Sequence, residues 1–119
     1  MSLSDKAEKQ LLELWVEKYK WLKLHTGDPG EACTSNTAAE TTRKSVTWGT
    51  PEEGAGKVVT TSEAKWEEVG SAETYKYVSF WDAETNGNAG GSGALETERT
   101  VAIGDTFIIK SGKWSVTLS

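Results

Sequence analysis

The segment Asp82–Asn88 carries oxygen-bearing side chains at alternate positions, which is the pattern of a calcium-binding loop. Gly87 stands sixth in it, where such a loop turns sharply. The bidentate carboxylate that completes a calcium site should come at the position of Gly93, which supplies no ligand. Asn-Gly is also a strong signal for a tight turn between two strands. We therefore favour a hairpin turn here, and we expect no metal site.

His25 is the only histidine and Cys33 the only cysteine, so few nucleophile–base pairs are possible. We expect His25 to face solvent on a strand and Cys33 to lie in a polar loop, with no catalytic group converging on either. A lone cysteine excludes an internal disulfide and a thiolate metal cluster. The sequence therefore predicts no catalytic residues and no cofactor, and the protein is not expected to be an enzyme.

Six tryptophans are many for 119 residues, and they are the strongest signal in the sequence. Tryptophan fills large spaces between two layers, so most of the indoles should lie in the core. The alternative is that an exposed set stacks on sugar rings, as in carbohydrate-binding modules. The candidates for glycan stacking are Trp48, Trp66 and Trp81, which lie in predicted strands.

The formal net charge of -5 makes some partners unfavourable. A polyanion is repelled on average, so neither nucleic acid nor an anionic membrane surface is an expected partner. No apolar run approaches the roughly 20 residues that span a bilayer, and the N-terminus lacks a signal-peptide pattern. We therefore expect the chain to be made in the cytoplasm.

Residues of about 5–18 have the spacing of an amphipathic helix, and Ser2 with Asp5 fits a capping box. The apolar stripe of this helix could cover an edge of a sheet, or it could dock on a partner or on sister copies. We expect mainly intramolecular packing with a share of interface. The candidate attachment surface is Leu11, Leu14, Trp15, Lys18 and Trp21.

From Lys20 onward the hydrophobic period changes from 3.6 to 2, which is typical of strands. The chain is therefore predicted to be mainly β, as an antiparallel β-sandwich or flattened barrel over about 20–119, within a single domain of residues 1–119. Residues 31–40 are expected to form a surface loop and 83–93 a glycine-rich turn. Expected strands are 20–26, 43–48, 57–62, 65–69, 74–82, a pair around 96–100, and a hairpin of 106–110 with 113–118 across Ser111-Gly112.

Several short pieces of the chain resemble the small structural proteins of tailed bacteriophages known as tail-fibre or minor structural proteins. The pieces are the strand end Leu24–Gly30, the Trp-Asp-Ala that ends an apolar strand at Ala83, and the Gly-Asp-Thr at 104–106. The resemblance spans nearly the whole chain. The sequence departs from the pattern in its lysine-rich helix and glutamate-rich middle, where the choice of partner would be encoded.

The resemblance implies a non-enzymatic virion component, attached in many copies to the capsid as a decoration protein or to the tail as a fibre or minor tail protein. Its partners would be the major capsid protein or tail proteins of the same virion, with self-association and host glycans as further partners. The protein would be made in the host cytoplasm and reside in the virion. The alternative function is a carbohydrate-binding module that contacts host-cell glycans.

Overall fold

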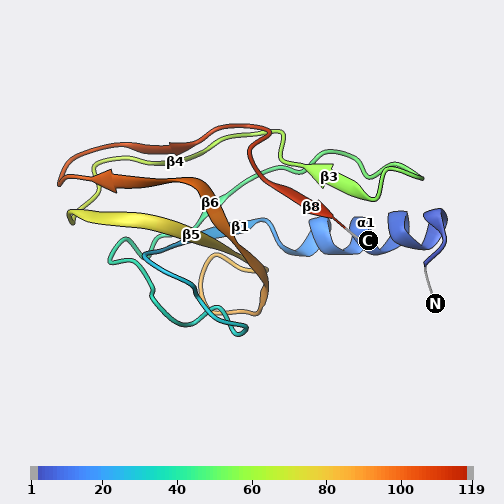
Figure 1. The fold of residues 1–119 in the computed structure, drawn as a ribbon, viewed down its shortest axis with the longest axis horizontal. Coiled ribbons are helices and arrows are strands. Elements are labelled where there is room, and N and C mark those ends of the chain that lie inside the picture. The colour runs from blue at the N-terminus through green and yellow to red at the C-terminus, as the bar shows by residue number, and fades with distance from the viewer. Residues whose placement is uncertain (1–2, 118–119) are drawn as a thin grey trace.

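The computed structural model describes residues 3–117 and contains one helix, α1 (Asp5–Lys18), followed by strands. The strands form two layers, and α1 extends along the long axis of the molecule from the start of the sheet (Figure 1). All the strand pairs are antiparallel, which confirms the predicted mainly β fold, and the described strands do not close into a barrel. The strands are β1 (Trp21–His25), β2 (Lys44–Ser45), β3 (Lys57–Val59), β4 (Ala64–Trp66), β5 (Glu73–Trp81), β6 (Ala89–Val101), β7 (Phe107–Ile109) and β8 (Ser115–Thr117).

The predicted helix is confirmed with its predicted bounds, and Ser4 caps it. The Ser4 hydroxyl accepts a hydrogen bond from the backbone N–H of Ala7 at 3.2 Å, which satisfies one of the free amides of the first turn. Acidic residues in the first turn and Lys18 in the last turn complement the helix dipole. The expected Ser2–Asp5 capping box involves Ser2, which lies outside the described residues.

A four-stranded sheet with the order β2-β1-β5-β6 forms one layer. In the β1–β5 pair, Leu22 lies opposite Phe80 and Leu24 opposite Val78, so these apolar side chains share one face. All four are buried in the main core. The alternate positions of the same strands point to the other face of the sheet, which the loop 26–43 covers.

The second layer is a long two-stranded ribbon. Residues 57–66 run antiparallel to 107–117, and the ladder passes from β4–β7 to β3–β8 through hydrogen bonds between Thr60 and both Trp114 and Gly112. The predicted hairpin across Ser111-Gly112 is therefore wrong. Gly112 has a φ of +80°, and the register shifts by one residue there, so the glycine forms a bulge inside the ribbon instead of a turn that reverses the chain.

The predicted glycine-rich turn at 83–93 is also partly wrong, because β6 begins at Ala89. A Cβ atom on Gly90 would collide with the ring of Tyr19, and one on Gly93 would lie 2.6 Å from the indole of Trp114. The glycines are therefore strand positions on which aromatic rings rest. The expected strand pair around 96–100 is likewise wrong, since β6 continues as one strand to Val101.

The main core lies between the two layers. It combines the inner face of the sheet with Trp66, Phe107 and Ile109 of the ribbon, and Tyr75 packs its ring 5.0 Å from that of Phe107. A smaller cluster joins α1 to β3. Within residues 3–117, no helix has the length and apolar character that crossing a membrane requires.

Candidate attachment surface and binding cleft

The helix α1 is fixed to the rest of the molecule by one of its faces. Leu12 and Val16 are buried and pack against Val58 of β3. Trp15 is half-buried, and its Nε1 donates a hydrogen bond of 3.3 Å to the carbonyl of Gly90. These contacts fix α1 beside the ribbon. The side chains on the other face of the helix are therefore held in a fixed orientation relative to the rest of the molecule.

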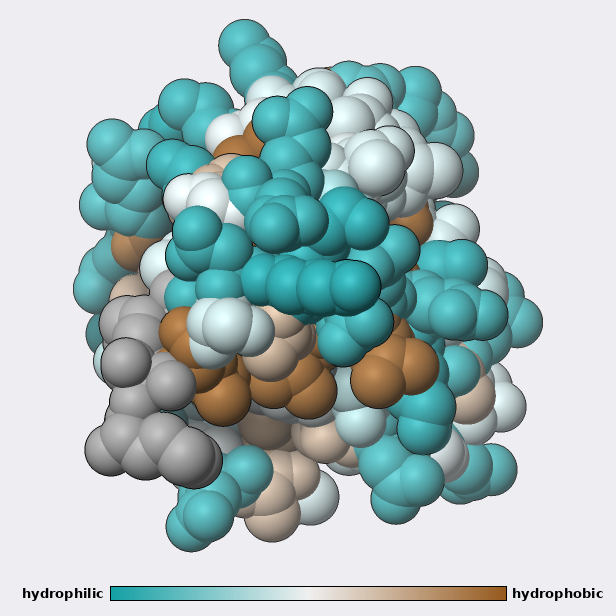
Figure 2. All heavy atoms as spheres, turned by 90° about the vertical axis from the view of Figure 1, so that its right-hand side faces the viewer, coloured by the Kyte–Doolittle hydropathy of each residue, from teal (hydrophilic) through white to brown (hydrophobic). Residues whose placement is uncertain are grey.

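A second apolar stripe of α1 lies in solvent. Leu11 and Leu14 are 45% and 60% exposed, and their spacing of three residues places them on one side of the helix. Leu3, which is 43% exposed, lies just before the helix. Lys18, which continues this side, is also exposed. The view onto the end of the molecule that carries α1 shows hydrophobic side chains gathered among polar ones (Figure 2). The structure therefore brings three of the five predicted attachment residues, Leu11, Leu14 and Lys18, to one open face.

The other two predicted attachment residues lie elsewhere. The ring of Trp15 packs between Tyr19, Trp48 and Phe80 with centroid distances of 5.1, 5.5 and 5.7 Å, which makes it part of the interior. Trp21 is half-buried on β1, opposite Trp81. The usable surface is thus the stripe of α1 formed by Leu11, Leu14 and Lys18, which we call the leucine stripe.

Of the three predicted glycan-stacking tryptophans, two are buried and one is half-buried. Trp66 is 1% exposed and donates a hydrogen bond of 2.7 Å to the carbonyl of Thr42. Trp81 is 7% exposed, and the guanidinium of Arg43 lies 4.1 Å from its ring centroid. Trp48 is half-buried against Trp15 and Phe80. Because a sugar needs an open ring face, Trp66 and Trp81 are not available for stacking.

His25 is completely buried, so the expectation that it faces solvent is wrong. Its Nδ1 lies 3.0 Å from the carbonyl of Ser35 and its Nε2 lies 2.7 Å from the Ser79 hydroxyl, which also accepts a hydrogen bond from Trp81. A carbonyl can only accept, so Nδ1 carries the proton and Nε2 accepts from Ser79. Burial lowers the pKa of His25, and both ring nitrogens are occupied by structural partners.

Cys33 is buried as well, although it was expected in an open polar loop. It is 1% exposed, and its Sγ donates to the carbonyl of Gly91 at 3.6 Å. Burial raises the pKa of the thiol, which keeps it protonated and poorly nucleophilic. Loop 26–43 folds back because the Glu73 carboxylate accepts hydrogen bonds from the amides of Ala39 and Glu40, which holds its far end on the sheet.

The segment Asp82–Asn88 forms a turn that its own side chains close. The Asp82 carboxylate accepts a hydrogen bond of 2.7 Å from the amide of Asn88, and Asn86 and Gly87 adopt positive φ angles of 57° and 74°. Arg43 donates from the neighbouring segment to the carbonyls of Ala83 and Asn86. Among residues 3–117, no cluster of three or more His, Cys, Asp or Glu side chains is arranged to hold a metal ion.

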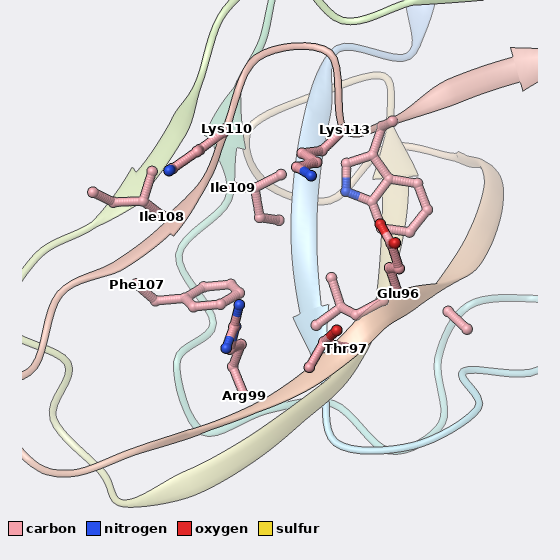
Figure 3. A pocket seen from close by; sticks show the side chains of 11 residues that line it. Glu96, Thr97, Arg99, Phe107, Ile108, Ile109, Lys110 and Lys113 are labelled. Carbon is pink, nitrogen blue, oxygen red and sulfur yellow. The ribbon is translucent and has the colours of Figure 1, made fainter.

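A cleft of about 420 Å³ opens between β6 and the ribbon (Figure 3). Arg99 and Glu96 enter it from β6, while Lys110 and Lys113 come from the segment that follows β7. Phe107 and the half-buried Trp114 supply aromatic surface. Three cationic side chains against one carboxylate give this cleft a local positive charge, in contrast to the net charge of -5 for the whole chain.

This cleft was not predicted from the sequence. Lys110, Lys113 and Trp114 are close in the sequence and could have been noticed as an aromatic residue flanked by cations. Arg99, however, reaches them only because β6 and β7 belong to different layers that meet at this edge. No local pattern predicts that meeting.

Comparison with known proteins identifies the family. A search of curated proteins finds no match. The family model described as Podophage GP4 fiber I protein gp80 matches residues 3–117, which is nearly the entire chain. The match covers α1, both layers and the cleft, and it agrees with the predicted resemblance to phage structural proteins. This chain belongs to the podophage GP4 fiber I protein gp80 family, a virion-associated family of phage fibre proteins.

Proposed function

We propose that the protein is a non-enzymatic structural component of the phage particle that attaches, in multiple copies, through the leucine stripe of α1. The observation that carries the proposal is the exposure of Leu11 and Leu14 on a helix whose opposite face is already anchored by Leu12 and Val16. Large apolar side chains that gather on the solvent-exposed surface of a folded protein are typical of interaction sites.

The size of the stripe favours many weak contacts over one strong contact. Covering a half-exposed leucine contributes about 1 kcal/mol, since complete burial of such a side chain is worth about 1.5–3 kcal/mol. The two leucines together therefore provide only modest affinity per copy. Repetition of the partner over the particle surface converts modest affinity into stable attachment through avidity.

The structural engagement of His25 and Cys33 supports a non-enzymatic function. Their polar atoms are bonded to Ser35, Ser79 and Gly91, and neither group is presented to solvent. Each therefore stabilises the covering loop.

The family's description as a fibre protein favours a place on the tail. The partner in that case is a tail protein of the same virion, with sister copies as a second contact. Decoration of the capsid, where the partner would be the major capsid protein, is the alternative location. In both cases the chain is made in the host cytoplasm and joins the particle during assembly.

Quantitative mass spectrometry of purified virions tests this proposal. The expected result is several copies of the chain per mature particle, and gold-labelled protein should appear at the tail in electron micrographs. Gold label on the capsid would instead show that the protein decorates the capsid and is not located at the tail. Absence of the chain from mature particles would overturn the structural function altogether.

A further inference from the structure

We propose that the cleft between β6 and the ribbon binds an acidic polysaccharide, with a uronate or sialate residue held by Arg99, Lys110 and Lys113 beside the indole of Trp114. Such binding would be a property of the cleft alone, wherever the protein sits in the particle. Of the tryptophans predicted for glycan stacking, Trp66 and Trp81 are buried and Trp48 is half-buried, whereas the cleft opens at the surface.

The cations of the cleft are free to act on a ligand. The salt bridges within residues 3–117 pair Lys9 with Glu13, Lys65 with Glu67 and Lys76 with Glu98, so none involves the cleft. Arg99 can meet a carboxylate with two parallel hydrogen bonds, and the two lysines add compact positive charges. A carboxylate-bearing ligand therefore complements the charge that the cleft concentrates.

Trp114 contributes both a ring surface and a free donor. Its benzene ring rests on Gly93, and its plane lies at 78° to the ring of Phe80 with a centroid distance of 5.6 Å, which fixes the indole in place. Among the hydrogen bonds of the described residues, Trp114 Nε1 donates none. By contrast, four other indoles donate to protein oxygens, namely Trp15, Trp48, Trp66 and Trp81.

The shape of the cleft agrees with a short stretch of carbohydrate. Its volume of about 420 Å³ falls within the range of small-ligand sites, and it is lined by a few polar groups around apolar side chains. The Thr97 side chain and the Glu96 carboxylate line the cleft and can form hydrogen bonds with sugar hydroxyls. An amphipathic ligand with hydroxyls, an apolar ring face and a negative charge satisfies all of these groups together.

An acidic peptide fits less well, because β6 does not offer a regular edge here. The strand pairs Tyr77 with Ala94 and Tyr75 with Arg99, so residues 95–98 all lie opposite Lys76 alone. Such a bulge breaks the spacing of backbone donors and acceptors that an added peptide strand would need. A nucleic acid would extend beyond the cleft over a protein whose net charge is -5.

Calorimetric titration of the full chain with oligogalacturonate, oligosialate and neutral maltooligosaccharides of equal length tests the proposal. Polyglutamate and oligothymidylate are titrated in the same way, as representatives of acidic peptides and nucleic acids. At least one acidic oligosaccharide should bind about tenfold more tightly than the neutral one, because one charge-assisted hydrogen bond is worth that factor. Arg99→Gln and Lys113→Gln should each weaken acidic binding by about tenfold. Lys57→Gln removes the same charge from β3, outside the cleft, and should leave binding within about twofold.

Three results would overturn the proposal. The first is failure of both acidic oligosaccharides to bind, or equal binding by the neutral one. The second is equal or tighter binding of polyglutamate or oligothymidylate, which would identify the ligand as a peptide or a nucleic acid. The third is equal affinity for the wild type and both cleft variants. Because the titration uses the isolated protein, each of these outcomes leaves the attachment of α1 to the virion unaffected.

Discussion

Replacing Gly90 with alanine should destabilise the protein by an amount that the structure allows to be estimated. A Cβ atom at this position would lie 2.6 Å from two ring carbons of Tyr19, closer than any ordinary contact. The clash involves a rigid aromatic ring that packs against Trp15 at 5.1 Å, so relief requires movement in the interior. Overpacking of this kind costs about 1–3 kcal/mol.

The neighbouring Gly91 provides a matched control on the same strand. Nothing lies within 4 Å of a Cβ built there, and its φ is not positive. Gly91→Ala should therefore be neutral or raise the free energy of unfolding by up to about 1 kcal/mol, because alanine restricts the unfolded chain. The two variants differ by one residue position and share the same chemical change.

Urea denaturation followed by tryptophan fluorescence measures the difference. Gly90→Ala should lower the urea midpoint by roughly 1 M relative to Gly91→Ala, given typical slopes for a domain of this size. A double-mutant cycle adds Tyr19→Ala to the wild type and to Gly90→Ala, and removing the ring should cost about 1 kcal/mol less in the Gly90→Ala background. Equal stability of the two single glycine variants would refute the packing of Tyr19 on Gly90.

Three further measurements address other parts of the structure. Burial lowers the pKa of His25, so the histidine of the unfolded chain takes up a proton first as the pH falls below about 6.5. The free energy of unfolding should therefore decline from that pH downwards. When urea midpoints are compared between pH 7.5 and 5, His25→Gln should lack this component of the decline. Ser4→Ala removes the helix cap and should cost about 1 kcal/mol in the same assay, whereas an unchanged midpoint would show that the cap does not contribute. Burial, with smaller contributions from Glu73 and Glu40, raises the pKa of Tyr75 to about 12. Ultraviolet titration should therefore show one tyrosine that ionises near pH 12. Complete ionisation of all tyrosines in the folded protein by pH 11 would contradict the burial of Tyr75.

The sequence predicted those elements whose signals are local. The helix at Asp5–Lys18 and strands β1 and β5 follow directly from hydrophobic period, and they appear with nearly their predicted bounds. The fold class follows from the number and spacing of the strands. Predictions failed where a glycine could have either of two structural roles. Gly112 forms a bulge in the ribbon instead of a hairpin turn, and Gly90 is a strand residue on which the ring of Tyr19 packs.

The burial of His25 shows a second limit of local pattern. Alternation along β1 correctly predicts that His25 and Leu24 point to opposite faces of the sheet. It predicts that His25 is exposed to solvent only if no other part of the chain covers the second face. Loop 26–43 covers it, because Glu73 on a distant strand holds the backbone of Ala39 and Glu40. The cleft was missed for the same reason, since Arg99 meets Lys113 only through the stacking of two layers.

The attachment of the leucine stripe to the virion is tested most directly by phage carrying Leu14→Glu. Leu14 is 60% exposed, so the substitution should leave folding within about 0.5 kcal/mol, while a buried carboxylate would disrupt a docked interface. Lys6→Gln changes the net charge by the same amount at an exposed position on the polar face of α1 and serves as the control. Mass spectrometry of purified particles should find the Leu14→Glu chain reduced at least about tenfold and the Lys6→Gln chain at wild-type level. Wild-type incorporation of the Leu14→Glu chain would contradict attachment through α1.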